Sequence, residues 1–223
     1  MSNYYSNFLS AERLKLCYDL APLRVSQYLD VEVDFVKQKI KTDDYVLELG
    51  CGYGRVLENI GLKTKYLFGI DQSLENLSFG QSNFLSHDCC VLSAMDAFHL
   101  GFQSGIFDLV FCIQNGISAI GGDSELLIKE AIRVTKPGGS ILFSSYSDKF
   151  WIHRLNWFQI QSDNNLIGEI DYNLTGKGII VCKDGFRATT FSEKKFKLLT
   201  TRLNKVVKTY EINESSIFCE IFV

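Results

Sequence analysis

Three glycines stand at every second position of the segment VLELGCGYGRVL, between an apolar run and a predicted helix start. A helix start after a parallel strand offers unpaired N–H groups and a positive dipole end, and glycine lets a ligand approach the backbone there. A dinucleotide loop, GxGxxG, is one interpretation. Here, however, Gly50, Gly52 and Gly54 form GxGxG. Arg55 stands where the dinucleotide loop needs its last glycine, and the Glu48 carboxylate would repel a pyrophosphate. The segment therefore favours a ligand with a cationic group near Glu48.

Strand and helix patterns alternate through the middle of the chain, and these elements must position the glycine segment. The apolar runs YVLEL, YLFGI, DCCVLS, FDLVFCI and GGSILFSSY are typical of buried strands. Helical spacing follows Ser73 and Asp123, which are residue types that cap helices. This alternation predicts an α/β domain with a parallel sheet. Two further strand-like runs, 205–212 and 216–223, are joined by the short turn Asn213–Glu214, so the last strand must be antiparallel.

We expect a single domain over residues 1–223, because this length suits one hydrophobic core. Residues 1–40 carry two helical patterns and are predicted to cover the sheet. Residues 147–190 are too long for a simple connection to the helix that begins at Ser192, and they form an insertion. Its first part, DKFWIHRLNWFQIQ, is rich in aromatic residues, and its second part predicts two or three strands. We interpret it as an α+β cap over a substrate.

Composition argues against several classes of function. The net charge is -3, whereas a general nucleic-acid binder needs clustered Lys and Arg. The basic stretch at 194–208 is interpreted as a solvated helix face. No uncharged apolar run is long enough to span a bilayer, and residues 1–20 do not resemble an export signal. The seven cysteines are odd in number and several lie in apolar runs, which indicates reduced thiols and a cytoplasmic protein.

Four more motifs follow the glycine segment in order: FGIDQS, MDAF, IFDLVFCI and RVTKPGGSILF. Together with ELGCGYG they resemble the class I S-adenosylmethionine-dependent methyltransferases, over roughly residues 40–146 and, through the terminal hairpin, 191–223. The resemblance implies a Rossmann-like, doubly wound, mostly parallel seven-stranded sheet with an antiparallel last strand. It also implies S-adenosyl-L-methionine as cofactor and S-adenosyl-L-homocysteine as product.

The resemblance assigns a cofactor contact to individual residues. Glu48 would contact the ammonium group, Asp71 the two ribose hydroxyls and Asp96 the adenine amino group. The N-terminal residues Tyr5 and Arg24, with Tyr28 as a further candidate, would close over the carboxylate. The full expected set is Glu48, Gly50, Cys51, Gly52, Gly54, Asp71, Gln72, Asp96, Ala97, Gln114, Tyr5 and Arg24. From the residues alone, Asp71 could instead cap the following helix, and Asp96 could cap a turn.

A catalytic base is optional in methyl transfer, because the cofactor carries the reactive group and the protein must chiefly align the acceptor and exclude water. His153, in the aromatic segment of the insertion, is the candidate base, although a lone His among aromatic residues also serves packing. Tyr146 is a second candidate, and Asn115 could orient the acceptor. No metal is expected, because the segment FCIQNGIS has no clustered acids.

The choice of methyl acceptor is limited mainly by motifs that this sequence lacks. The segment after the fourth strand has neither the (D/N/S)PP(Y/F) signature of exocyclic base methylation nor a Pro-Cys pair for cytosine carbon methylation. With the modest charge, this argues against nucleic acid and favours O- or N-methylation of a small molecule. The aromatic residues of the insertion could form either the acceptor pocket or the insertion's own core. The alternative function is a non-catalytic binding or regulatory module that acts through a protein partner.

Overall fold

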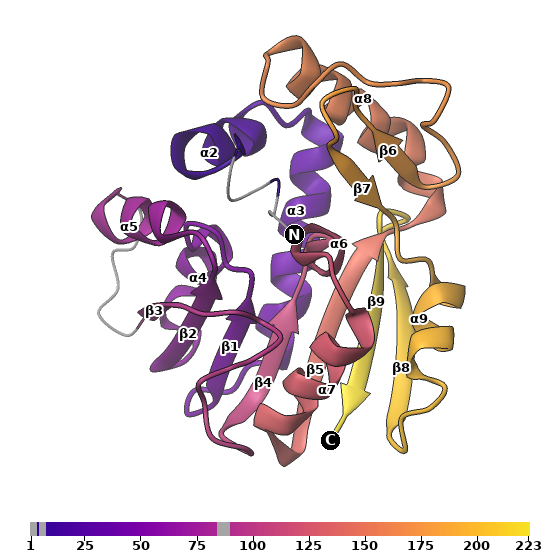
Figure 1. Ribbon diagram of the computed structural model, residues 1–223. Coiled ribbons are helices and arrows are strands. Elements are labelled where there is room, and N and C mark those ends of the chain that lie inside the picture. Colours follow the sequence, from indigo (N-terminus) through magenta and orange to yellow (C-terminus); the bar gives the residue numbers. More distant parts are fainter. Residues whose placement is uncertain (1–3, 5–7, 84–89) are drawn as a thin grey trace.

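The computed structural model describes residue 4 and residues 8–83 and 90–223. A seven-stranded sheet in the order β3-β2-β1-β4-β5-β9-β8 forms the centre of this part of the chain (Figure 1). The strands are β1 Tyr45–Leu49, β2 Tyr66–Asp71, β3 Cys90–Ala94, β4 Phe107–Cys112, β5 Thr135–Tyr146, β8 Val206–Ile212 and β9 Ser216–Phe222. All neighbours pair in parallel except β9, which is antiparallel to both β5 and β8. The predicted fold class is confirmed.

Helices cover both faces of this sheet (Figure 1). The helices of the described residues are α2 Ala11–Asp19, α3 Leu23–Lys39, α4 Arg55–Ile60, α5 Leu74–Asn83, α6 Gly116–Ile120, α7 Ser124–Val134, α8 Trp151–Asp163 and α9 Glu193–Thr200, with short 3-10 turns η1 Gly61–Lys63 and η2 Asp148–Phe150. Two of the expected caps are formed. The hydroxyl of Ser73 accepts from the N–H of Asn76 at 3.2 Å, and Asp123 accepts from the N–H groups of Glu125 and Leu126 at 2.9 and 3.2 Å.

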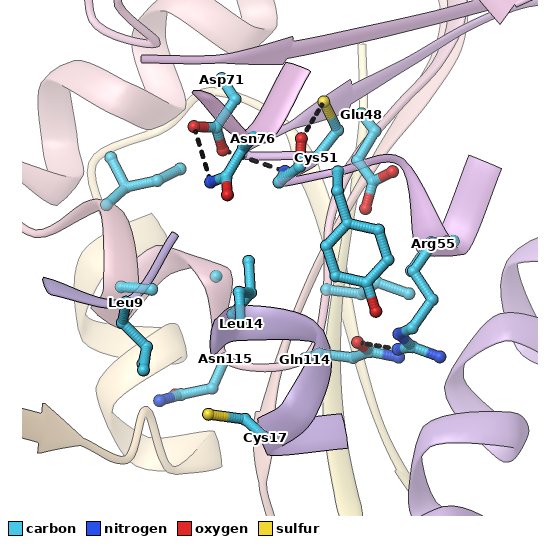
Figure 2. Close-up of a pocket in the computed structure, with 18 of the residues that line it drawn as sticks. Leu9, Leu14, Cys17, Glu48, Cys51, Arg55, Asp71, Asn76, Gln114 and Asn115 are labelled. Carbon is cyan, nitrogen blue, oxygen red and sulfur yellow. Dashed lines mark hydrogen bonds between the residues drawn. The ribbon is translucent and has the colours of Figure 1, made fainter. Parts of the chain in front are cut away.

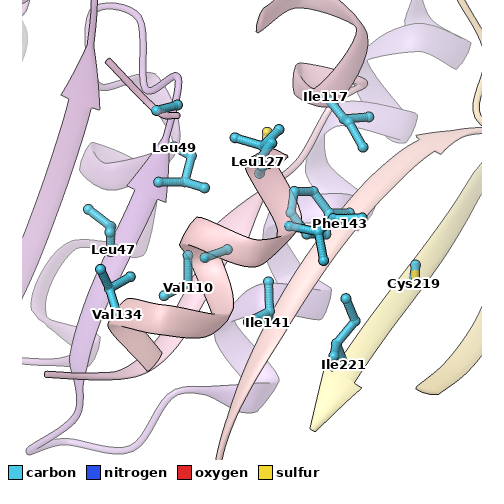
Figure 3. Packing of buried hydrophobic residues seen from close by; sticks show 14 of the residues in the cluster. Leu47, Leu49, Val110, Ile117, Leu127, Val134, Ile141, Phe143, Cys219 and Ile221 are labelled. Carbon is cyan, nitrogen blue, oxygen red and sulfur yellow. The ribbon is translucent and has the colours of Figure 1, made fainter. Parts of the chain in front are cut away.

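The buried strands supply a hydrophobic core on each side of the sheet, because successive side chains of a strand point to opposite faces. In β4, Leu109 packs in the cluster that contains Val36 of α3, while Val110 packs in the cluster that contains Leu127 of α7. Figure 3 shows the second cluster, with Ile141 of β5 beside the same helix. Strands buried on both faces fix the sheet rigidly, so the loops at its carboxyl ends are held in place.

A third layer lies beyond the carboxyl ends of the parallel strands (Figure 1). It contains α2, the first turns of α3, helix α8 and a two-stranded antiparallel sheet of β6 Ile179–Val181 and β7 Arg187–Thr189. Its own buried cluster joins Tyr28 of α3, Trp157 of α8 and Ile180 of β6. The segment predicted as an insertion therefore packs against the N-terminal helices.

The cysteines and the hydropathy of the helices bear on two predictions made from composition. The cysteines that the structure describes are all free; Cys112, Cys182 and Cys219 are buried as expected, whereas Cys90 is only half-buried because it begins β3 at the edge of the sheet. In residues 8–83 and 90–223, no helix combines the length and the hydropathy that a bilayer crossing requires.

Candidate functional site

A pocket lies at the carboxyl ends of β1, β2 and β4, and α2 and α8 form its other walls. This is the place where open α/β sheets bind ligands. The predicted site residues that line it are Glu48, Gly50, Cys51, Gly52, Asp71, Gln72, Ala97, Gln114, Asn115 and Tyr146. They come from five separate segments of the chain, which the parallel sheet brings together.

The loop after β1 holds its three glycines in the left-handed region. The φ angle is +72° at Gly50, +56° at Gly52 and +83° at Gly54, and side chains rarely tolerate such values. The N–H of Gly50 donates to the carbonyl of Ile70 at 2.9 Å, which ties the loop to β2. A Cβ added at Gly52 would lie 3.1 Å from Leu14 of α2. The spacing of the glycines therefore serves the turn itself as well as close approach to the pocket.

The carboxyl group of Glu48 and the guanidinium group of Arg55 lie on one side of the pocket (Figure 2). Glu48 is 5% exposed, and its Oε2 has no hydrogen-bond partner among the described residues. Burial raises the pKa of Glu48 to about 8, against the opposing effect of Arg55. Arg55 begins α4, donates to the Oε1 of Gln114 and lies over the ring of Tyr18, 4.4 Å from its centroid. The Nε of Arg55 is also buried and has no hydrogen-bond partner within the described part of the chain, so the two groups together complement a zwitterion.

Asp71 ends β2 and supports both the glycine loop and the start of α5. Its Oδ2 accepts from the N–H of Gly52 at 2.9 Å, and its Oδ1 accepts from the N–H of Ser73 at 2.8 Å. Burial raises the pKa of Asp71, and these backbone hydrogen bonds oppose the shift. An ionised carboxylate has about four lone-pair positions, so Asp71 can still accept hydrogen bonds from a ligand in the pocket.

The motif around Asp96 differs from the prediction that Asp96 itself contacts the cofactor. Asp96 does not line the pocket; its Oδ1 accepts from the N–H of Phe98 at 2.9 Å, as a turn cap does. The same oxygen accepts from Nε2 of Gln72 at 3.3 Å, and Gln72 does line the pocket. Ala97 lines it too, and it is buried. Asp96 thus contacts a residue that lines the pocket, without lining the pocket itself.

Helix α8 contributes three pocket residues that were not among the predicted site residues: Trp157, Phe158 and Gln161. They lie at helical spacing in the second half of α8. The Nε1 of Trp157 donates to the carbonyl of Cys17 at 2.9 Å and so ties α8 to α2. Both sequence interpretations of the aromatic segment apply, since Trp157 and Phe158 belong to a buried cluster and also face the pocket.

Two predicted residues, Arg24 and His153, lie away from the pocket. Arg24, at the start of α3, donates to the carbonyl of Asn213 at 2.6 Å and lies over the ring of Phe150 instead of lining the pocket. His153 is exposed in the first turn of α8, with its ring 5.4 Å from that of Phe150. The pocket is lined only by residues from the second half of this helix, so the structure does not place His153 beside it.

Four further residues complete the comparison with the sequence. Tyr5 lies outside the described residues. Tyr28 is buried behind the pocket, where its ring stacks on that of Tyr146 at 5.0 Å. Gly54 caps α4 without lining the pocket. Tyr146 does line the pocket, but burial raises its pKa, so its hydroxyl keeps its proton near neutral pH and is not suited to act as a base.

A second buried carboxyl, Glu32 of α3, holds the loop after β4. Glu32 is fully buried, and its Oε2 accepts from the N–H of Gln114 and from the hydroxyl of Ser144, both at 2.6 Å. Burial raises the pKa of Glu32 to about 7, while these hydrogen bonds oppose the shift. Gln114 and Asn115 have φ angles of +55° and +63°. Glu32 therefore stabilises a left-handed turn at the edge of the pocket.

The raised pKa values of Glu32 and Glu48 predict how stability depends on pH without ligand. Both exceed the ordinary value of 4.5, so the folded state binds more protons than the unfolded state above that pH. The free energy of unfolding should fall as pH rises from about 4.5 to about 8, by up to about 1.4 kcal/mol per pH unit for each carboxyl. Urea unfolding at pH 5, 6.5 and 8 measures this. Glu32→Gln and Glu48→Gln should each reduce the slope, and an unchanged slope in both would contradict the prediction.

Known proteins that resemble this chain in sequence are methyltransferases. A family model described as a methyltransferase domain matches residues 46–139. A malonyl-[acyl-carrier protein] O-methyltransferase of Marinomonas sp. (strain MWYL1) is 33% identical over 138 residues, which is 56% of this chain and 49% of that protein. The chain thus spans about half the length of this relative.

Two solved structures resemble the whole chain in fold. The DhpI-SAM-HEP complex has a TM-score of 0.65 and 19% identity, and covers 98% of this chain and 94% of its own. A SAM-dependent methyltransferase from Aquifex aeolicus has a TM-score of 0.63 and 15% identity, and covers 94% and 98%. Residues 46–139 therefore match a methyltransferase domain in sequence, and the described part of the chain has the fold of S-adenosylmethionine-dependent methyltransferases.

Proposed function

We propose that the pocket binds S-adenosyl-L-methionine and that the chain transfers its methyl group to a small-molecule acceptor, which leaves S-adenosyl-L-homocysteine. The observation that carries the proposal is the pair of unsatisfied buried groups, the Oε2 of Glu48 and the Nε of Arg55, beside the glycine loop. Buried polar groups normally have partners. An amino-acid end with its ammonium toward Glu48 and its carboxylate toward Arg55 would supply both.

The remaining cofactor contacts follow from the shape of the pocket. In Figure 2, Asp71 lies apart from Arg55 across the pocket, which suits a ligand with an amino-acid end and a ribose. Asp71 would accept hydrogen bonds from ribose hydroxyls. Gln72 and Ala97 would border the base, and Asp96 would fix Gln72. Arg55 takes the role that the sequence assigned to Arg24.

The acceptor would lie between the end of β5 and α8, where Tyr146, Trp157 and Phe158 form a largely apolar wall. Residues 147–190 would then act as the cap over the acceptor. The chain's own residues need to hold the acceptor in line with the methyl group and to exclude water. Because neither His153 nor Tyr146 fits the role of a base, we favour an acceptor oxygen or nitrogen that is already a nucleophile at neutral pH.

Two other observations support the proposed cofactor and a cytoplasmic location. The DhpI-SAM-HEP complex shares the fold and contains SAM by its name, and the Marinomonas relative is named as an O-methyltransferase. The free cysteines are those of a reducing compartment, which supports a cytoplasmic location.

Isothermal titration calorimetry with S-adenosylhomocysteine and S-adenosylmethionine tests the proposal directly. We expect one molecule bound per chain. Transfer is then measured as incorporation of a labelled methyl group from the cofactor into a pool of small metabolites. Binding without incorporation would favour a non-catalytic binding module, and absence of binding of either compound would refute the proposal.

Proton release on binding is a sharper prediction for Glu48. With a pKa of about 8, this carboxyl is mostly protonated at pH 7 in the unliganded protein. An ammonium group placed beside it favours the charged form and lowers its pKa. Binding at pH 7 should therefore release close to one proton, roughly 0.9 for a pKa one unit above the pH. Calorimetry in buffers of different ionisation enthalpy measures this number.

A matched pair of variants shows which carboxyl releases the proton. Glu48→Gln should abolish the release, while Glu32→Gln should retain it, because Glu32 is equally buried but does not line the pocket. Release that persists in Glu48→Gln would contradict the assignment of Glu48 to the ammonium group.

A further inference from the structure

The side chain of Asn115 is oriented by a hydrogen-bond relay at the acceptor end of the pocket. We propose that this relay fixes the Asn115 amide as a donor into the pocket, so that the protein selects neutral acceptors that present an oxygen lone pair, from a hydroxyl or a carbonyl group. The inference rests on the proposed function, since it concerns the molecule that would lie beside the bound cofactor.

The relay has three members, and its direction follows from the donors and acceptors. The N–H of Phe191 donates to Oγ of Ser145 at 2.8 Å, and Ser145 Oγ lies 2.6 Å from Oδ1 of Asn115. A backbone N–H can only donate, so the hydroxyl proton of Ser145 is available for Asn115. If the amide were turned over, this proton would lose its acceptor among the described residues. Ser145 is fully buried, so that loss would be costly.

The amide nitrogen of Asn115 is the group that remains for a ligand. Asn115 is 6% exposed and lines the pocket, and its Nδ2 has no hydrogen-bond partner among the described residues. In Figure 2, Asn115 lies on the same side of the pocket as Cys17, well separated from Asp71 and Glu48. The donor is therefore placed at the acceptor end and not at the ribose or ammonium end.

The backbone of Asn115 is also held firmly. Its φ angle is +63°, and its carbonyl accepts from the N–H groups of Ser118 and Ala119 at 2.9 and 3.2 Å. The N–H of the preceding residue, Gln114, donates to Oε2 of Glu32 at 2.6 Å and to Oγ of Ser144 at 2.8 Å. A side chain on a fixed backbone, with one amide atom already bonded, presents its other atom in one direction. Such pre-organisation is what a specificity-determining contact requires.

The other polar side chains at the acceptor end of the pocket are uncharged. Among the described residues that line the pocket, the charged side chains are Glu48, Arg55 and Asp71, which all belong to the proposed cofactor side. Gln161 is 3% exposed, lines the pocket and has an amide without a hydrogen-bond partner in the described part of the chain. A second neutral amide beside aromatic walls can also meet a hydroxyl or carbonyl group. An ammonium group would find no carboxylate at this end.

The test compares two probes of similar size and opposite hydrogen-bonding character on protein saturated with S-adenosylhomocysteine. Acetophenone only accepts hydrogen bonds, and benzylammonium only donates them. Ligand-observed NMR titration gives the dissociation constant of each. In the unaltered protein, acetophenone should bind at least about ten-fold more tightly than benzylammonium, because benzylammonium would leave the amide of Asn115 unpaired.

Three variants separate orientation from simple packing. Asn115→Asp replaces the donor by an acceptor and should reverse the preference. Ser145→Ala frees the amide to turn and should bring the ratio of the two affinities toward one, without a change in S-adenosylhomocysteine affinity. Ser145→Thr keeps the hydroxyl and should restore the ratio. Thermal melting checks that each variant folds.

The outcomes distinguish this inference from the proposed function. If calorimetry shows no S-adenosylhomocysteine binding, the proposed function and this inference fail together. If S-adenosylhomocysteine binds but neither probe does, or both probes bind equally well, this inference alone is overturned. A preference for acetophenone that survives unchanged in Asn115→Asp also overturns it.

Discussion

Replacement of Asp71 by alanine should weaken S-adenosylhomocysteine binding by roughly 100-fold or more. If Asp71 binds the ribose as proposed, the variant loses two charge-assisted hydrogen bonds, each worth about 1.5–3 kcal/mol, and every 1.4 kcal/mol is about ten-fold in affinity. It also removes the acceptor for the N–H of Gly52, so the glycine loop loses a support. Calorimetry measures the affinity, and circular dichroism with thermal melting shows whether the fold persists.

Asp123→Ala is the matched control for Asp71→Ala. Asp123 also accepts two backbone N–H groups next to a helix start, but it does not line the pocket. Its loss should cost about 1 kcal/mol of stability, as for other helix caps, and leave affinity for S-adenosylhomocysteine unchanged. If Asp71→Ala retained its affinity, or if Asp123→Ala lost as much as Asp71→Ala, the ribose assignment would be wrong.

Gly80→Ala should be the most destabilising conservative substitution in the glycine-loop region. A Cβ at Gly80 of α5 would lie 2.2 Å from the carbonyl oxygen of Tyr53 and 2.8 Å from its carbonyl carbon. Both are backbone atoms, so no side-chain rotation relieves the contact, and α5 must move from the loop. We expect a loss of about 3 kcal/mol, at the upper end of the usual cost of overpacking. The melting temperature should fall by about 6–12 °C.

Gly101→Ala provides the control for Gly80→Ala. The nearest atom to a Cβ at Gly101 is the Cε of Met95 at 3.7 Å, which is an ordinary contact. This variant should melt within a few degrees of the unaltered protein. Affinity for S-adenosylhomocysteine should fall in Gly80→Ala alone, because only there is the loop displaced. Equal melting temperatures in the two variants would show that the loop absorbs the extra methyl group.

Much of the fold could be predicted because its signals are local. Apolar runs and helical spacing gave the parallel strands, and residue type alone identified the caps Ser73 and Asp123. The turn at Asn213 and Glu214, with φ angles of +50° and +52°, was predicted from its short polar connection. The position of β9 between β5 and β8 has no local signal, because it depends on pairing between distant segments.

The candidate site was predictable to the extent that its residues belong to contiguous motifs. Glu48 is the penultimate residue of β1 and Asp71 is the last residue of β2, so the parallel pairing of these strands places both at the carboxyl edge of the sheet. Arg24 and His153 were misplaced because a helical pattern does not reveal which part of a helix meets a distant pocket. Gln161 was missed for the same reason. Arg55 did carry a signal, as a cation directly after the glycine loop at a helix start.

The order of strands in the sheet has a consequence for how the chain folds. Since β9 separates β8 from β5, β9 is the one strand among the described residues that β8 pairs with in this sheet, so we expect the two to assemble first as a hairpin and then to join the sheet as one unit. Hairpins form in about 1–10 µs, much faster than long-range pairing. Until that docking, β5 lacks its second neighbour, and Ser145 lacks the pairing with Ile217. The relay that orients Asn115 is therefore among the last features of the molecule to form.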